Sequence, residues 1–139
     1  MIIAVIDTNV VVAALLSKFE DSATVRVMTE VLTGNIIPIY SNAILTEYQN
    51  VLSREKFDFP KEDQDYITAS IAQFGIHVQP LCTNTVLPDI KDTPFYDASK
   101  YYAGCYLITG NKKHFPEDEF IVSPKEMLDK LQNGITLSC

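Results

Sequence analysis

The chain has few cysteines, few basic residues and no long hydrophobic run. Its three cysteines, Cys82, Cys105 and Cys139, are widely spaced and include no Cys-x-x-Cys pair, which argues against both a zinc site and a disulfide framework. The longest apolar run, around Val10 to Leu16, is far too short to cross a bilayer, and no signal-like segment precedes the first predicted strand. We therefore expect a cytoplasmic protein with reduced thiols and no membrane contact.

The scarcity of bases bears on nucleic-acid binding. Lysine and arginine number 11 against 18 acids, so the formal net charge is -7. Modules that bind DNA or RNA neutralise backbone phosphates with lysine and arginine, so composition alone speaks against such a module. An acidic catalytic site is not excluded, because bound divalent cations reverse the local charge and attract phosphate.

The order of apolar segments predicts the fold class. The 139 residues, 47% of them hydrophobic, are enough for one domain over residues 1–139 with a single core. Ile2 to Ile6 form a continuous apolar run, typical of a strand that is buried on both faces. Further predicted strands cover residues 36–40, 76–78, 106–108 and 120–122. The predicted helices cover residues 9–16, 22–32, 41–53, 60–74 and 93–103, and a last helix begins at 123–124. This alternation predicts an α/β domain with a parallel sheet covered by helices on both sides.

Two of these helices carry local signals that a structure can test. Ser123 and Glu126 form a Ser-x-x-Glu capping box, with Pro124 at the first helical position. The helix that begins near Pro60 has an apolar stripe that places Phe74 among its inward residues.

Polar residues follow two of the predicted strands directly. In open parallel sheets the ligand crevice lies outside the carboxyl ends of the strands. Asp7-Thr8-Asn9 follows the first strand, and Thr109-Gly110-Asn111 follows the strand at 106–108. Asp7 alone is also a good N-cap for the next helix, so its interpretation depends on what else the chain supplies.

Two more acids are candidates for the same crevice. Glu47 lies on the apolar face of its helix, where a carboxylate is costly unless it is paired or bound to a metal; an edge position or an ion pair with Arg26 is the alternative. Asp92 opens the next-to-last helix and points to the same side as its inward residues, with simple N-capping as the alternative. Asp89 lies in the approach loop and could assist, whereas Asp97 is predicted to be on the solvated face.

Asp7, Glu47, Asp92 and Asn111 would together offer only oxygen ligands, which suits Mg²⁺ or Mn²⁺ and disfavours zinc. Carboxylates gathered without a cation repel one another, and a bound metal removes that conflict. Such a site is suited to phosphodiester hydrolysis.

Four segments together resemble the PIN domain family, in the branch of toxins from toxin–antitoxin systems. They are the strand that ends in Asp7-Thr8-Asn9-Val10, the helical Leu45-Thr46-Glu47-Tyr48, the segment Asp89 to Tyr96, and Tyr106 to Phe115. The resemblance covers nearly the whole chain in the expected order. It implies a three-layer α/β/α PIN fold with a central parallel sheet of about five strands.

The resemblance also implies a function and a site. It implies an endoribonuclease that cleaves single-stranded RNA with Mg²⁺ or Mn²⁺, forms a homodimer and is blocked by an antitoxin protein. Asp7, Glu47 and Asp92 match the family's first three acids, which are catalytic and bind the metal. Asn111 stands where the family commonly has a fourth acid, so it is the fourth catalytic candidate, and its neutral amide weakens the case for a second metal.

The residues beside this site are candidates for substrate binding. They are Asn9, Thr109, Lys112 and Lys113. The two lysines form, with His114, the only basic cluster, which can hold phosphates or simply be solvated. We assign His114 no catalytic role.

Other functions fit less well. A haloacid-dehalogenase-like phosphatase needs a second Asp two residues after the first, and position 9 is Asn. A receiver-like domain needs a central-strand Asp and a Lys after the last strand, and neither is evident. A non-catalytic PIN module that binds protein or RNA is the strongest alternative, since Asn111 and the acidic composition permit it.

Overall fold

The computed structural model describes residues 2–80 and 82–137, which form a single five-stranded parallel sheet with helices on both sides. The strands are β1 (Ile2–Ile6), β2 (Ile36–Tyr40), β3 (Ile76–His77), β4 (Tyr106–Ile108) and β5 (Ile121–Val122). The helices are α1 (Thr8–Leu16), α2 (Ala23–Leu32), α3 (Asn42–Leu52), α4 (Lys61–Phe74), α5 (Thr93–Tyr101) and α6 (Pro124–Leu137), with short 3-10 turns η1 (Glu55–Phe57), η2 (Ile90–Asp92) and η3 (Lys112–His114). The predicted α/β class and the α/β/α PIN-like architecture are confirmed.

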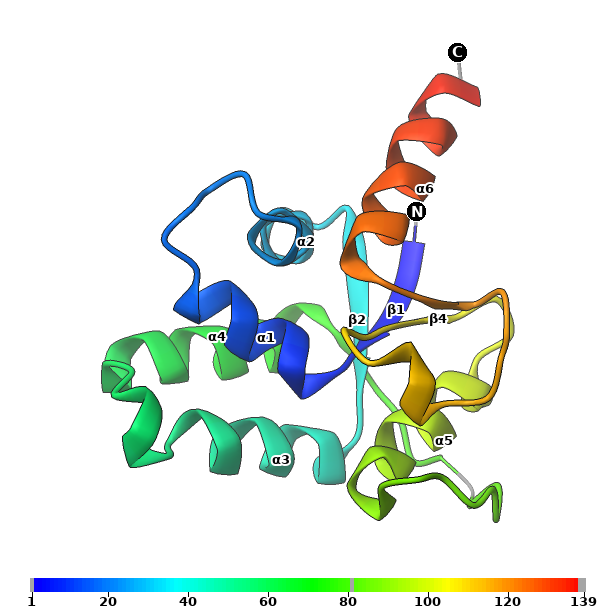
Figure 1. The fold of residues 1–139 in the computed structure, drawn as a ribbon, viewed down its shortest axis with the longest axis horizontal. Helices are drawn as coiled ribbons and strands as arrows, with labels where there is room; N and C mark the ends of the chain where they lie inside the picture. Colours follow the sequence, from blue (N-terminus) through cyan, green and yellow to red (C-terminus); the bar gives the residue numbers. More distant parts are fainter. Residues whose placement is uncertain (1, 81, 138–139) are drawn as a thin grey trace.

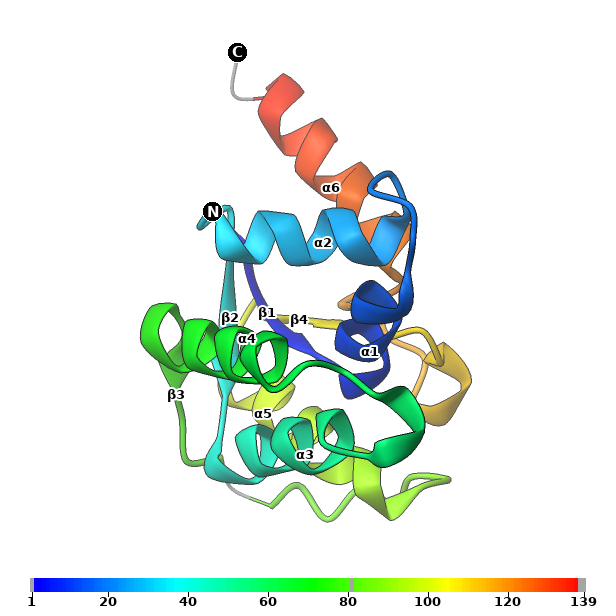
Figure 2. The same cartoon turned by 90° about the vertical axis from the view of Figure 1, so that its left-hand side faces the viewer.

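The strand order β3-β2-β1-β4-β5 explains the layers. Right-handed crossovers that lead outward from β1 to β2 and β3 place α1 to α4 on one face, and the return crossover to β4 places α5 on the other. Figure 1 shows this division, with α1, α3 and α4 on one side of β2 and α5 on the opposite side. In Figure 2 the face that carries α1 to α4 is turned toward the viewer.

The central strand β1 explains the apolar run at the start of the sequence. It pairs in parallel with β2 on one side and with β4 on the other. Ala4, Val5 and Ile6 are fully buried, as a strand covered on both faces requires. The register places Ile6 opposite Ile108. The residues that follow β1 and β4 therefore emerge side by side at the carboxyl edge of the sheet.

The local helix signals have mixed outcomes. The capping box is confirmed, because Ser123 Oγ accepts a hydrogen bond from the Glu126 N–H (3.1 Å) while Glu126 Oε1 accepts one from the Ser123 N–H (2.9 Å). The inward position of Phe74 is wrong: its side chain is 57% exposed. Phe74 is the last residue of α4, and the edge strand that follows it is only two residues long, so the sheet offers it little cover.

None of the helices in the described part of the chain is both long and apolar enough to cross a membrane.

Candidate active site

A cleft of about 420 Å³ opens at the carboxyl ends of β1 and β4. The strand order reverses between these two strands, which is the point where open α/β sheets bind their ligands. Of the eight residues proposed for catalysis or binding, five line this cleft: Asp7, Asn9, Glu47, Asp92 and Asn111. The topology thus gathers in one place side chains that lie up to 104 residues apart in sequence.

Asp7 is the most enclosed acid of the cleft, with 4% of its surface exposed. Its backbone N–H donates to the Ile108 carbonyl (2.9 Å), which continues the β1–β4 pairing by one residue. Its Oδ2 accepts hydrogen bonds from Thr109 Oγ1 (2.7 Å) and Asn9 Nδ2 (3.1 Å). Although Asp7 occupies the N-cap position of α1, its side chain makes no capping bond. Its carboxylate is therefore held by the side chains of Thr109, after β4, and of Asn9, in α1, and not by a helix-capping bond.

Burial raises the pKa of Asp7 from its ordinary value of 3.8 to about 6. Two smaller effects act on the same pKa: the hydrogen bond from Thr109 lowers it, and the negative charge of Asp92 raises it. The buried hydroxyl of Tyr48 donates to the Ile6 carbonyl, and burial together with the charge of Asp7 raises the Tyr48 pKa well above its usual value. Tyr48 therefore keeps its hydroxyl proton and serves as a hydrogen-bond donor beneath the site.

A hydrogen-bonded frame holds Asp7 in place. Asn9 Oδ1 accepts from the Gly110 N–H (3.0 Å), and Thr109 Oγ1 accepts from the Asn111 N–H (3.0 Å). Thr109 is fully buried, so these contacts give it a positioning role toward Asp7. Asn9 spans the two strand ends in the same way. Direct contact of either side chain with a substrate stays a prediction.

Asp92 is the second acid with a raised pKa. It lies at the end of η2 and, like Asp7, makes no capping bond to the helix that follows. Burial is the main cause of the raised pKa; the charges of Asp89 and Glu47 add to it, while a hydrogen bond from His114 lowers it. His114 Nδ1 lies 3.1 Å from Asp92 Oδ2.

Glu47 is half-buried on α3 and lines the same cleft. Within the described residues, no ion pair joins it to Arg26, the base considered as its alternative partner, and Arg26 is exposed. The charge of Glu47 reaches Asp92, and the charge of Asp92 reaches Asp7. The three acids therefore form one electrostatically coupled set.

The donors of the cleft fit a hydrated divalent cation. Asp7, Glu47 and Asp92 supply hard oxygen ligands, and the Thr8 hydroxyl beside them is buried with no hydrogen-bond partner. Over the described residues, no three Asp, Glu, His or Cys side chains are already gathered closely enough to hold a metal ion. Mg²⁺ is usually held by one or two carboxylates and keeps several waters, so a closed cage is not required.

The basic residues of the cleft differ from those that the sequence suggested. Lys112 pairs with Glu126 (2.9 Å), and both Lys112 and Lys113 line a separate hollow beyond η3. Of the described residues, the basic ones that line the cleft are Arg54, Lys91 and His114. Arg54 lies just after the end of α3, in extended backbone before η1, so helical periodicity gave no signal for its place in the cleft.

Asp97, predicted to be solvated, is buried, with 8% of its surface exposed. Its Oδ1 accepts hydrogen bonds from the Thr83 hydroxyl (2.7 Å) and the Thr83 N–H (3.2 Å). The loop before α5 folds back over this face of the helix and covers it, which helical periodicity does not reveal.

Comparison with known proteins gives one match. A family model described as the PIN domain matches residues 4–113, which include Asp7, Glu47, Asp92 and Asn111. No curated protein matches the chain, and no solved structure does. Since the family model covers well over half of the sequence, the chain belongs to the PIN domain family.

Proposed function

We propose that this protein is an endoribonuclease that hydrolyses single-stranded RNA with Mg²⁺ or Mn²⁺. PIN domains are generally nucleases, which gives the reaction class. The observation that carries the proposal is the buried Asp7, whose pKa is raised to about 6 beside a second acid with a raised pKa. Buried carboxylates with raised pKa values at a ligand crevice are typical of functional sites.

Each residue of the cleft has a definable part in this reaction. Asp7, Glu47 and Asp92 would hold the cation, which supplies a Lewis acid for the phosphate and lowers the pKa of a water molecule. Thr109 and Asn9 fix the Asp7 carboxylate before the metal binds. His114 holds Asp92 in orientation from the other side of the cleft.

Arg54 and Lys91 line the cleft and are suited to bind the phosphates that flank the scissile bond. Asn111 also lines the cleft, and its amide can orient a water without adding charge. We therefore propose one tightly bound metal in place of two.

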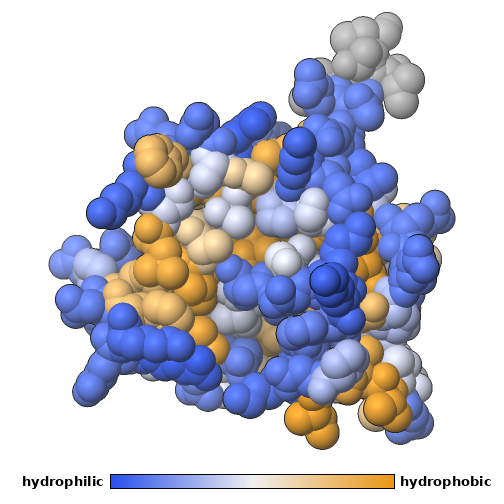
Figure 3. All heavy atoms as spheres, in the orientation of Figure 1, coloured by the Kyte–Doolittle hydropathy of each residue, from blue (hydrophilic) through white to orange (hydrophobic). Residues whose placement is uncertain are grey.

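We further propose that the protein acts in the cytoplasm as the toxin of a toxin–antitoxin pair, as a homodimer. The resemblance of its motifs supports this role. Exposed apolar side chains also lie near the acids: Leu16 lines the cleft and is 52% exposed, and Phe19, three residues further on, is 71% exposed. Figure 3 shows apolar surface on the side of the molecule where α1 lies. Exposed apolar surface beside a catalytic cleft is suited to an inhibitory protein partner. Sedimentation of the purified protein, alone and with the product of an adjacent gene, tests both associations.

The test of the nuclease is cleavage of fluorescent single-stranded RNA with Mn²⁺, with Mg²⁺ and with chelator. Asp7→Asn serves as the inactive variant, and Asp118→Asn serves as a matched control because Asp118 lies outside the cleft. We expect metal-dependent cleavage by the wild type and the control, and none by Asp7→Asn. Full activity of a folded Asp7→Asn protein would refute the mechanism.

A non-catalytic binding module is the second candidate. Two observations favour it: Asn111 in place of the fourth acid, and the lack of a preassembled three-ligand cluster in the part of the chain that the structure describes. Calorimetric titration with Mn²⁺ separates the two candidates, because a scaffold has no need of a metal that depends on Asp7.

A further inference from the structure

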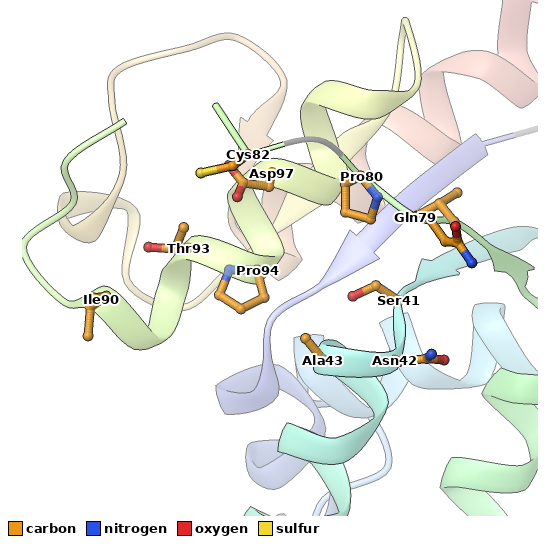
Figure 4. A pocket seen from close by; sticks show the side chains of 11 residues that line it. Ser41, Asn42, Ala43, Gln79, Pro80, Cys82, Ile90, Thr93, Pro94 and Asp97 are labelled. Atoms are coloured by element: carbon orange, nitrogen blue, oxygen red, sulfur yellow. The ribbon is translucent and has the colours of Figure 1, made fainter. Parts of the chain in front are cut away.

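A second cavity of about 500 Å³ lies on the same edge of the sheet, beyond the ends of β2 and β3. Figure 4 shows Ser41 and Ala43, at the start of α3, across the opening from Pro80 and Pro94. Val78 and Asp97 also line it. The mechanism proposed above makes no use of this pocket.

The pocket and the acidic cleft share one wall. Asp89, Lys91 and Asp92 line the cleft, whereas Ile90 and Thr93, from the same short segment, line the pocket. The two cavities are thus separated by the thickness of a single turn, η2. An extended RNA strand with one phosphate among the acids would bring a neighbouring nucleotide close to this turn.

The size and lining of the pocket suit a neutral planar group. Its volume lies in the usual range of about 300–1,000 Å³ for small-ligand sites. Most of the lining is apolar, with Val78, Pro80 and Pro94 among its members. Among the residues that the structure describes, no lysine, arginine or histidine lines the pocket, and Asp97 adds a carboxylate, so a phosphate does not fit there.

Hydrogen-bonding groups border this apolar lining. Asn42 and Ala43 occupy the first turn of α3, where backbone N–H groups have no partner within the helix. On the other side Asp97 is buried, and its two described hydrogen bonds, both from Thr83, end on Oδ1. A nucleobase presents both acceptors and donors on its edge, and proteins read unpaired bases by such bonds together with apolar packing on the ring faces.

We propose that this pocket is a subsite for an unpaired base, next to the phosphate that is cleaved. The inference rests on the proposed nuclease function and deepens it, because it names what the enzyme recognises. A base can enter the pocket only when it is unpaired and splayed out, so the subsite selects single-stranded RNA over a duplex. It also makes cleavage depend on the identity of one nucleotide beside the cut.

The test uses Ala43→Trp, which places an indole in the pocket, and Gln49→Trp as a matched control. Gln49 lies on the same helix, is exposed and lines neither cavity. The substrates are RNA oligonucleotides with one cleavage site and either a normal or an abasic nucleotide at each flanking position. For the wild type we expect loss of one flanking base to slow cleavage by about tenfold or more, on the scale of single base contacts.

Ala43→Trp should abolish this difference between normal and abasic substrates, and Gln49→Trp should retain it. The inference is overturned if the wild type cleaves every abasic substrate as fast as the normal one, or if Ala43→Trp retains the full difference.

A binding experiment keeps the subsite testable if no RNA is cleaved, a result that would count against the proposed function alone. Fluorescence of 2-aminopurine in a single-stranded oligonucleotide is measured with Asp7→Asn protein, without metal, in the Ala43→Trp and Gln49→Trp backgrounds. Weaker binding only in the Ala43→Trp background supports the subsite. Equal binding in both backgrounds overturns it.

Discussion

Replacing Asp7 by Asn should make the metal-free protein more stable at neutral pH. Lifting the pKa of this carboxyl from 3.8 to about 6 costs the folded state about 3 kcal/mol once the acid is ionised, since a tenfold change in proton affinity is worth about 1.4 kcal/mol. An Asn can still accept the hydrogen bonds of Thr109 and Asn9, but its amide needs an acceptor of its own, at a cost of about 1–2 kcal/mol. We therefore expect a net gain of about 1–2 kcal/mol, or roughly 3–8 °C in Tm.

The stability of the wild type should also depend on pH, in a direction set by the raised pKa of Asp7. Because the folded-state pKa lies above the unfolded-state pKa, the folded protein binds more protons between pH 3.8 and about 6. Wild-type stability should thus fall as the pH rises through this window and level off above it. The ionisation cost of Asp7 is full at pH 7.5 and about half as large at pH 5, whereas the cost of the unpaired amide does not change with pH. The net advantage of Asp7→Asn should therefore be full at pH 7.5 and close to zero at pH 5.

The assay is thermal and urea unfolding in chelator and in Mn²⁺. Asp118→Asn serves as a control, because its expected change in stability is opposite to that of Asp7→Asn. Lys100 and the Phe120 N–H lower the pKa of Asp118, so loss of its charge should destabilise the protein at pH 7.5. Mn²⁺ at 100 times its Kd should stabilise the wild type by about 2.7 kcal/mol and Asp7→Asn far less. An Asp7→Asn protein less stable than the wild type in chelator would refute the reasoning, since ionised Asp7 would then contribute to the stability of the fold.

Three further substitutions test the frame around Asp7 and the packing of the sheet. Thr109→Val removes a donor to the Asp7 carboxylate, so the acid limb of the pH–rate profile, expected near pH 6, should move to higher pH, and stability should fall by about 1–3 kcal/mol. His114→Ala removes the contact that lowers the pKa of Asp92, so Mn²⁺ affinity measured by calorimetry below pH 7 should fall while the unfolding midpoint in urea changes little. Gly75→Ala should lower the urea midpoint strongly, because its Cβ would lie 2.5 Å and 2.7 Å from carbonyl oxygens of α4 and β2; an unchanged midpoint would contradict this packing.

The sequence predicted those features that follow from buried strands and local caps. The apolar run at Ile2–Ile6 predicted a strand that is buried on both faces, and Asp7 directly after it predicted the position of the crevice. The capping box at Ser123 and Glu126 was correct because it depends on four consecutive residues. Such signals are local, and no distant segment alters them.

Features that depend on distant segments were missed. Asp97 is buried because the loop at Thr83 covers a helix face that looks polar by periodicity. His114 reaches Asp92 across 22 residues, and no pattern in either segment predicts the contact. The lysines beside the site turned out to face a neighbouring hollow, because η3 directs Lys112 toward Glu126.

The acidic composition and the proposed substrate are compatible because of where the charges lie. Burial and the charge of Asp92 raise the pKa of Asp7 to about 6, so near pH 6 the metal-free cleft carries less negative charge than its sequence suggests. Burial also raises the pKa of Asp92. On the proposed mechanism a bound cation would make the same cleft suited to a phosphate, and Arg54 and Lys91 line its walls. The net charge of -7 then repels RNA at long range without preventing binding at the cleft, and it leaves recognition to short-range contacts such as an apolar base pocket.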